Sequence, residues 1–171
     1  MAKILGRHVY SNKFKSHSQN PIDETKILYV NAKKTEGLNS RISSTEIREI
    51  QKITEYLKQN NHSDFVILTP YKKQVKMLNK CMLEERNDLK ILTVHGSQGR
   101  EWETVILSVV DTSDKWFVDS TSTISKGLNL INTAVSRAKK NLIIVCDTKY
   151  WLSLNGQLIS DLIKSGNEFV F

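Results

Sequence analysis

The sequence predicts an α/β fold in which a parallel β-sheet is flanked by helices on both faces. Short apolar runs rich in Val, Ile and Leu recur along the 171 residues, and segments with helical periodicity separate them. The composition, 39% hydrophobic and 25% charged, is that of a globular protein, and the length suits one hydrophobic core. Because no apolar run approaches the ~20 residues that cross a bilayer, we expect no membrane-spanning segment.

The charge balance favours a polyanionic partner such as a nucleic acid. Lys plus Arg outnumber Asp plus Glu by 25 to 18, which gives a formal net charge of +7. A soluble basic surface without such a partner is the alternative that charge alone leaves open. The two cysteines, Cys81 and Cys146, lie far apart among apolar neighbours, so we expect small core residues of a reducing compartment, in the cytoplasm or the nucleus.

The chain divides into a lead-in and one domain. Residues 1–25 are polar and basic without clear periodicity, and we expect them to form an irregular segment laid over a neighbouring domain. Met1 to Gly6 is too short and too weakly apolar for a signal peptide. Residues 26–171 are expected to form the α/β domain.

The first elements of this domain are a strand and a capped helix. A buried strand is predicted at Ile27–Val30. Ser43 and Glu46 have the spacing of a capping box, which predicts the start of a helix that continues to about Gln59. The apolar residues expected on its buried face are Ile47, Ile50, Ile53 and Leu57.

A second strand and helix follow. The run Phe65–Leu68 predicts a buried strand, and Thr69 and Pro70 after it supply a capping hydroxyl and a proline suited to the first helical position. The buried face of this helix is expected to contain Val75, Leu78 and Met82.

The remaining elements alternate in the same way. Strands are predicted at Ile91–Val94 and Val105–Val110, and a hydrophilic stretch from Asp111 to Lys126 comes after them. The last predicted elements are a helix at Leu128–Ala138, a strand at Leu142–Cys146 and a final helix that starts at Thr148, bends at Gly156 and buries Trp151, Leu154, Leu158 and Leu162. In a parallel sheet ligands bind at the carboxyl ends of the strands, so we expect function in Thr69–Gln74, His95–Glu101 and Asn132–Arg137.

Each of these three segments has a functional and a structural interpretation. At Thr69–Gln74 a helix start, a hydroxyl and two lysines suit a phosphate backbone, but capping explains the same residues. At His95–Glu101 the two glycines allow close approach to a ligand, and a tight connection between strands also needs glycines. His95 has no other ligand-type residues at metal spacing, so we expect no metal site.

The third segment contributes one cation. Arg137 emerges from an otherwise small and apolar stretch, Ile131–Ala138, that predicts a buried helix. Such a guanidinium is usually paired with an acid, and the alternative is that it reaches a phosphate held by another domain.

Taken in order, the three segments resemble motifs IV, V and VI of the superfamily 1 helicases, in the branch that contains the helicase of nonsense-mediated RNA decay and its DNA-acting relatives. The resemblance extends over nearly the whole chain and includes the lead-in from Val9 to Ser16. The matching residues are Thr69-Pro70-Tyr71-Lys72-Lys73-Gln74, Val94-His95-Gly96-Ser97-Gln98-Gly99-Arg100-Glu101 and Asn132-Thr133-Ala134-Val135-Ser136-Arg137-Ala138.

This resemblance implies the second, C-terminal RecA-like domain of a two-domain motor, with the P-loop NTPase fold but without its own P-loop. ATP with Mg²⁺ would then bind in the cleft between this domain and an N-terminal RecA-like domain of the same protein, and single-stranded DNA or RNA would lie across both. Arg137 matches the arginine finger, and Glu101 and Gly99 match the motif V residues at the nucleotide. The positions that match the neighbourhood of the nucleic-acid backbone are Thr69, Pro70, Val94 and His95.

The sequence departs from the family at Asn129, Leu130 and Thr133, where the family has a basic pair and a valine. It also contains no Gly-x-x-x-x-Gly-Lys-(Ser or Thr) segment and no strand ending in paired acids for Mg²⁺. We therefore expect half of an ATP site, inactive alone. The alternatives are an ATP-independent module that binds single strands and a structural or regulatory α/β domain in which Arg137 forms a buried ion pair.

Overall fold

The computed structural model describes residues 1–9, 25–37, 40–82, 89–112 and 126–171. Six strands in these residues form one parallel sheet in the order β3-β2-β4-β5-β1-β6. The strands are β1 (Lys26–Asn31), β2 (Phe65–Thr69), β3 (Ile91–Thr93), β4 (Trp102–Ser108), β5 (Ala138–Cys146) and β6 (Asn167–Glu168). The predicted α/β fold with a parallel sheet flanked by helices is confirmed.

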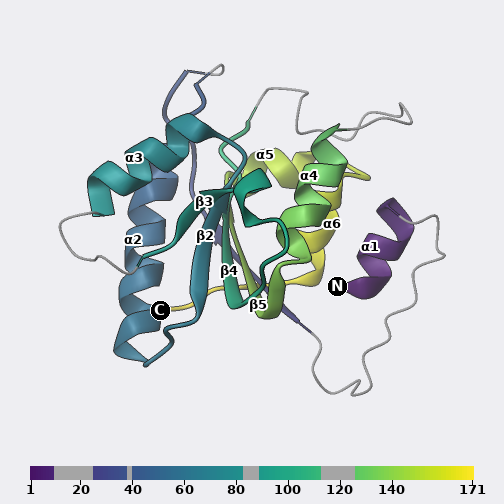
Figure 1. Cartoon of the computed structure of the whole chain (residues 1–171). Helices are drawn as coiled ribbons and strands as arrows, with labels where there is room; N and C mark the ends of the chain where they lie inside the picture. Colours follow the sequence, from purple (N-terminus) through teal and green to yellow (C-terminus); the bar gives the residue numbers. More distant parts are fainter. Residues whose placement is uncertain (10–24, 38–39, 83–88, 113–125) are drawn as a thin grey trace.

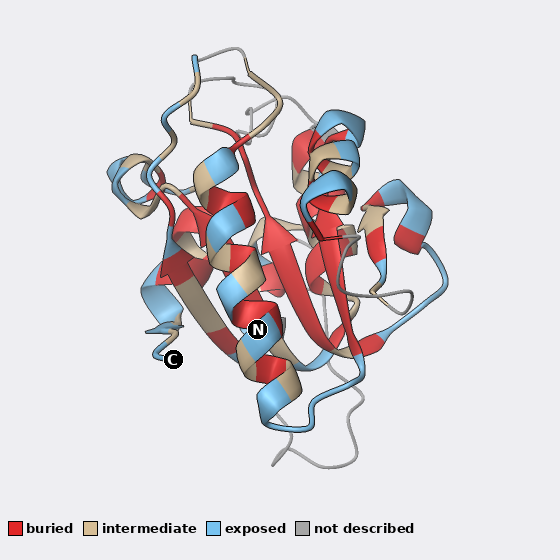
Figure 2. Cartoon of the chain, turned by 90° about the vertical axis from the view of Figure 1, so that its left-hand side faces the viewer, coloured by how far each residue is buried: buried red, intermediate tan, exposed pale blue. Residues whose placement is uncertain are grey.

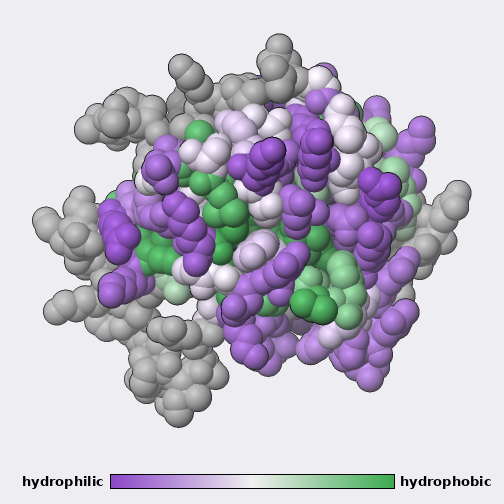
Figure 3. Space-filling model, turned by 180° about the vertical axis from the view of Figure 1, so that it is seen from behind, coloured by the Kyte–Doolittle hydropathy of each residue, from purple (hydrophilic) through white to green (hydrophobic). Residues whose placement is uncertain are grey.

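Helices cover both faces of the sheet (Figure 1). On one face, α2 (Ser44–Gln59) and α3 (Lys72–Met82) enclose a core that includes Ile50, Ile53 and Leu78. On the other, α4 (Lys126–Val135), α5 (Thr148–Ser153) and α6 (Leu158–Ser165) enclose a core around Trp151 and Leu162. In Figure 2 the buried residues run along the strands and the sheet-facing sides of the helices. The rear surface in Figure 3 is mostly hydrophilic, with only small hydrophobic patches.

The start of α2 has one of the two hydrogen bonds of the predicted capping box. Ser43 Oγ accepts a hydrogen bond of 3.3 Å from the Glu46 backbone N–H, and Ile42 and Ile47 pack in the same hydrophobic cluster. The Glu46 side chain does not return to Ser43, because it is fully buried and bonds to Ser108 and to the Val110 backbone instead. The helix start was predicted correctly, and the destination of its glutamate was not.

The prediction of an irregular lead-in is wrong for its first residues. Ala2–His8 forms α1, which packs against α6 through the 4% exposed Leu5 of the core and a 2.8 Å contact between His8 Nε2 and Asp161 Oδ2. Burial of an apolar side chain on a neighbouring helix stabilises a short helix that periodicity alone does not reveal. Residues 10–24, and with them most of the Val9–Ser16 resemblance, lie outside the described residues.

The helix α3 begins two residues later than predicted. Thr69 Oγ1 accepts a bond of 3.4 Å from the Tyr71 N–H, and the Tyr71 carbonyl accepts the first helical bond, from Val75 N at 3.0 Å. Tyr71 is therefore the cap, and Pro70 lies in the turn before it. The core prediction for the cysteines holds for Cys146, which is buried, but Cys81 is exposed because it lies about 100° around α3 from its buried neighbour Met82.

Two boundaries near the carboxyl end were also wrong. The helix predicted over Leu128–Ala138 ends at Val135, because β5 starts at Ala138 rather than at Leu142. The predicted final helix is two helices, since the chain breaks after Ser153 and Gly156 there has a φ of +73°, which lies outside helical backbone.

The sequence did not predict β6, which adds to the edge of the sheet beside β1. Gly166 precedes it, and a Cβ at this position would lie 2.8 Å from the Ile27 carbonyl oxygen. The close approach of the two backbones therefore requires glycine.

Candidate functional site

The structure separates the predicted site residues into two groups at opposite edges of the sheet. Thr69 ends β2 and Val94 directly follows β3, whereas Glu101 directly precedes β4 and Arg137 directly precedes β5. Because β3 and β4 are parallel, their connection runs from the carboxyl edge of the sheet to the amino edge. The expectation that all three segments lie at carboxyl ends is therefore wrong for Glu101 and Arg137.

The carboxyl-edge group joins the first two segments directly. The Val94 N–H donates to the Thr69 carbonyl at 3.0 Å. Both side chains are fully buried, Pro70 is half-buried and His95 is exposed. Only Pro70 and His95 of the four predicted nucleic-acid residues therefore offer side chains to a partner; Thr69 and Val94 fix the shape of the turn.

A short 3₁₀ turn, η1 (His95–Ser97), starts the connection toward the amino edge. The Gly96 N–H donates to Thr93 Oγ1 at 3.2 Å, and Ser97 Oγ donates to the Val94 carbonyl at 2.6 Å. Gly99 follows with a φ of +76°, and no neighbouring atom lies within 4 Å of where its Cβ would be. Its backbone angle, rather than crowding, is thus what favours glycine here.

The amino-edge group centres on Arg137. The Trp102 N–H donates to the Arg137 carbonyl at 3.0 Å, which joins the start of β4 to the turn between α4 and β5. The guanidinium donates from Nε to the Thr133 carbonyl at 3.1 Å, from Nη1 to the Arg100 carbonyl at 3.2 Å and from Nη2 to Ser136 Oγ at 2.9 Å. Gly99 and the exposed Glu101 flank Arg100, so the structure brings together the three residues predicted at the nucleotide.

The environment of Arg137 bears on one of its two interpretations, the buried ion pair. It lies in a turn rather than on the predicted helix, and its side chain is half-buried. Within the described residues it forms no ion pair, and its three acceptors are uncharged. A guanidinium has five N–H groups, so these contacts hold its orientation and leave one N–H on each terminal nitrogen for a ligand.

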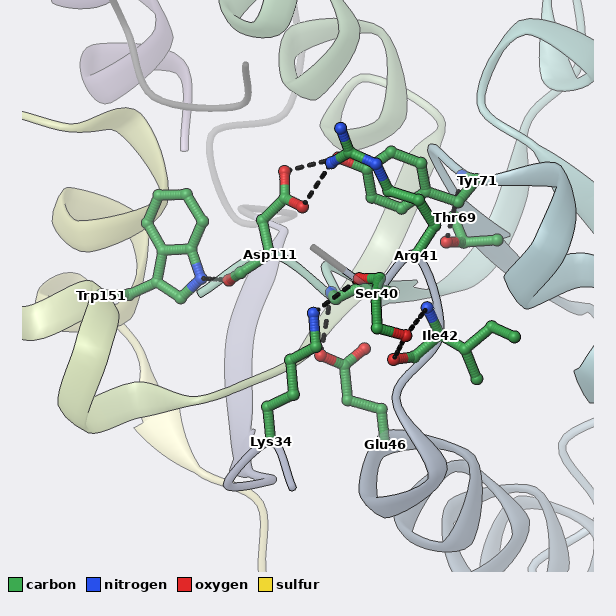
Figure 4. A network of polar contacts seen from close by, with 10 residues as sticks. Lys34, Ser40, Arg41, Ile42, Glu46, Thr69, Tyr71, Asp111 and Trp151 are labelled. Carbon is green, nitrogen blue, oxygen red and sulfur yellow. Dashed lines mark hydrogen bonds and ion pairs between the residues drawn. The ribbon is translucent and has the colours of Figure 1, made fainter. Parts of the chain in front are cut away.

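A polar network at the carboxyl edge was not found from the sequence (Figure 4). The Asp111 carboxylate, 2% exposed, accepts bonds from the Tyr71 hydroxyl at 2.5 Å and from Arg41 Nη1 at 3.1 Å. The Arg41 guanidinium also lies 4.7 Å from the centre of the Tyr71 ring. Trp151 Nε1 donates to the Asp111 carbonyl at 3.1 Å. The network fixes Tyr71, the residue that caps α3.

Glu46 is a second buried carboxyl group in this region. It accepts bonds from Ser108 Oγ at 2.6 Å and from the Val110 N–H at 2.8 Å, and Val110 has a φ of +70°. Burial raises the pKa of Glu46 from 4.5 to about 8, and it outweighs these two bonds and the charge of Lys34, which lower that pKa. We therefore infer that Glu46 is largely protonated at neutral pH.

Gln74, part of the motif-like segment, connects this region to α3. Its amide donates to the Ser43 carbonyl at 3.2 Å and to Ser108 Oγ at 3.1 Å, and its oxygen accepts from the Ser43 N–H at 3.0 Å. A signal for Asp111 was available, since a polar residue directly after a strand of a parallel sheet is a candidate site residue. Arg41 carries no such signal, because nothing local in the sequence relates it to Tyr71.

Within the ranges that the structure describes, no cluster of three His, Cys, Asp or Glu side chains has the geometry to hold a metal ion. No helix there has the length and apolar character needed to cross a membrane.

A family model described as an AAA domain matches residues 4–149 of this chain. An uncharacterized ATP-dependent helicase of Methanocaldococcus jannaschii is 31% identical over 127 residues, which cover 72% of this chain and 18% of that protein. DNA-binding protein SMUBP-2 of Mesocricetus auratus is 34% identical over 86 residues, covering 50% of this chain and 8% of that protein. The chain thus spans less than a fifth of the length of these relatives.

Among solved structures, the C-terminal domain of a possible DNA helicase from Lactobacillus plantarum WCFS1 is 12% identical, with a TM-score of 0.49 over 72% of this chain and 74% of that one. An arterivirus nonstructural protein 10, a helicase, is 17% identical, with a TM-score of 0.40 over 95% of this chain and 25% of that one.

Proposed function

We propose that this chain, which belongs to the AAA domain family as a C-terminal RecA-like domain of a superfamily 1 helicase, is the second motor domain of an ATP-dependent DNA or RNA helicase. The printed description of the Methanocaldococcus jannaschii relative, an ATP-dependent helicase, supports the motor, and that of SMUBP-2, a DNA-binding protein, supports a nucleic-acid substrate. The partner of the domain would be an N-terminal RecA-like domain of the same protein.

The observation that carries the proposal is the environment of Arg137. Its guanidinium is oriented by two backbone carbonyls and a hydroxyl, has no acidic partner within the described residues, and keeps one N–H on each terminal nitrogen for a ligand. A fixed cation of this kind supports an arginine finger, which stabilises the charge that develops on a phosphate during hydrolysis and contributes about 10³-fold or more in rate. Glu101 and Gly99 would flank the same nucleotide.

These residues fit the outer oxygens of a phosphate group but do not form a complete nucleotide site. Two N–H donors suit phosphate oxygens, and no P-loop occurs in the 171 residues to hold the rest of a triphosphate. ATP with Mg²⁺ would therefore be bound mainly by the N-terminal motor domain. The bound ATP would supply the phosphoanhydride bond that is broken. The role of this chain would be to present Arg137 to that phosphate while water attacks it and ADP leaves.

The single strand would cross the carboxyl edge of the sheet. His95 and Pro70 would contact it directly, and the buried Thr69 and Val94 would hold the two segments in register through their 3.0 Å backbone bond. The nucleotide residues lie at the amino edge, so the connection from Val94 to Glu101 would link the strand to the ATP site. Closure on ATP and release after hydrolysis would then move the strand.

An ATP-independent module that binds single strands is the second candidate, and the formal net charge of +7 together with the missing P-loop favours it. The two functions are separated by strand-stimulated ATP hydrolysis in the longer protein that carries both motor domains. The motor requires such hydrolysis, and the module predicts none. The purified 171-residue chain should bind strands without hydrolysing ATP, and turnover above the buffer blank by this chain would contradict the proposed half-site.

A further inference from the structure

One surface of α3 carries charge of a single sign. The sequence of this helix contains no acidic residue, and its four lysines are all exposed. At about 100° of rotation per residue, the four side chains fall within an arc of about 100° that lies opposite the buried side of the helix. The α3 lysine face consists of Lys72, Lys73, Lys76 and Lys80, and the buried side consists of Gln74, Leu78 and Met82.

The neighbouring helix α2 shows what an ordinary solvated surface looks like in this protein. Its exposed side mixes both signs, and Lys52 Nζ pairs with Glu49 Oε1 at 2.9 Å. No lysine of the α3 lysine face forms an ion pair with any residue that the structure describes. Lys76 is four residues from both Lys72 and Lys80, and like charges at this spacing destabilise a helix. A bound polyanion would remove this repulsion.

The position of the α3 lysine face points to the same polyanion as the proposed strand track. In Figure 1, α3 leads from the carboxyl end of β2 toward the outside of the molecule. Lys72 comes three residues after Thr69, and the first turn of α3 contains no acid. The free N–H groups of a helix start attract phosphate, and so do the lysines, so both features favour binding of the same anionic backbone.

We propose that the α3 lysine face binds the phosphodiester backbone of the nucleic-acid segment that continues beyond the strand track. The inference rests on the proposed function and extends it to the outer surface of the domain. From Lys72 to Lys80 the helix rises about 12 Å, and one strand of a duplex carries a phosphate about every 3.4 Å, so the face spans three or four phosphates. Ammonium groups act as point charges, so this binding is independent of sequence.

The test is the salt dependence of binding by the 171-residue chain, measured by fluorescence anisotropy between about 50 and 300 mM salt. The probes are a labelled oligothymidylate of about 20 nucleotides and a duplex with a single-stranded tail. The double variant Lys76→Gln/Lys80→Gln removes the two lysines that lie farthest from the track. Each lost phosphate contact reduces the magnitude of the negative slope of log K against log salt by about 0.7 on a single strand and about 0.9 on a duplex. For two lysines we therefore expect the magnitude of the slope to fall by about 1.4 on a single strand or about 1.8 on a duplex. A loss of about 1.4 on the oligothymidylate assigns the face to a single strand, whereas a loss of about 1.8 on the tailed duplex with none on the oligothymidylate assigns it to a duplex.

Two further variants control for net charge and for folding. Arg48→Gln/Lys52→Gln on α2 removes the same two charges and should leave the slope unchanged, whereas Lys76→Arg/Lys80→Arg should keep the slope of the unaltered chain. Equal slopes for the α2 and α3 double variants would overturn the proposal. Binding to phosphatidylserine vesicles is measured in parallel. If the α3 double variant weakened binding to these vesicles but not to the nucleic acids, the face would be assigned to a membrane surface and the proposal would be overturned. If the unaltered chain bound neither probe, both the proposed function and the lysine-face proposal would fail. If the unaltered chain bound and the α3 double variant kept the same slope, only the lysine-face proposal would be refuted.

Discussion

Replacing Glu46 with Gln should remove a large part of the pH dependence of folding stability between pH 5.5 and 7.5. Glu46 is fully buried, and burial raises its pKa from 4.5 to about 8. Gln keeps the size of the side chain and stays neutral at every pH, so it resembles the protonated acid. Its amide can still accept the bond of the Val110 N–H and donate to Ser108 Oγ.

The sign and size follow from the difference in pKa between the folded and unfolded chains. Between pH 4.5 and about 8, folded Glu46 holds a proton that the unfolded chain has released, so raising the pH favours unfolding. The stabilisation is complete below pH 4.5 and is lost as the pH rises through about 8. Within this window the free energy of unfolding falls by about 1.4 kcal/mol per pH unit, or about 2.7 kcal/mol over two units.

The assay is urea unfolding of both chains at pH 5.5, 6.5 and 7.5, followed by tryptophan fluorescence. Subtracting the two free energies at each pH cancels the contributions of all other titrating groups. We expect the variant to gain about 1.4 kcal/mol on the unaltered chain with each pH unit. A difference that stays constant within about 0.5 kcal/mol would mean that Glu46 is already ionised in the folded chain, and the burial argument would be refuted.

Two further changes test the packing of the domain. Gly166→Ala places a Cβ 2.8 Å from the Ile27 carbonyl oxygen and should lower the free energy of unfolding by about 1–3 kcal/mol. The control is Gly37→Ala, which has no atom within 4 Å of its Cβ and should change the free energy of unfolding by less than about 0.5 kcal/mol. Equal effects of the two changes in urea unfolding would contradict the close approach. Asp111→Ala should cost about 3 kcal/mol, the low end for breaking a buried ion pair, because the Arg41 side chain is 32% exposed; a loss below about 1 kcal/mol would show that the pair is not structural.

The sequence predicted the elements whose signal is local. Each predicted strand overlaps a strand of the sheet, although β4 covers Trp102–Ser108 rather than Val105–Val110, and α2 starts after Ser43 as the capping chemistry predicted. Boundaries that depend on partners were missed. The strand β5 begins at Ala138 because Trp102 of β4 pairs with it, and α1 forms because Leu5 is buried against a helix from the other end of the chain.

The sequence named the residues of the candidate site, whose roles stay predictions, but it did not reveal how those residues are laid out. Motif-like segments identified Arg137 and Glu101 from short runs of sequence, and only the parallel arrangement of β3 and β4 reveals that these residues lie at the amino edge, away from Thr69. The network of Asp111 and Arg41 joins residues 70 positions apart, and no local pattern encodes such a pairing.

In the proposed motor, this domain supplies one fixed cation to a nucleotide that the N-terminal motor domain holds. The most direct measurement is kcat for strand-stimulated ATP hydrolysis by the longer protein with Arg137→Ala, beside Lys139→Ala, which removes an exposed charge two residues away. We predict a loss of about 10³-fold in kcat for Arg137→Ala with strand binding retained, and a change of less than about threefold for Lys139→Ala. Hydrolysis by Arg137→Ala within tenfold of the unaltered protein, or unfolding of that variant, would contradict the account.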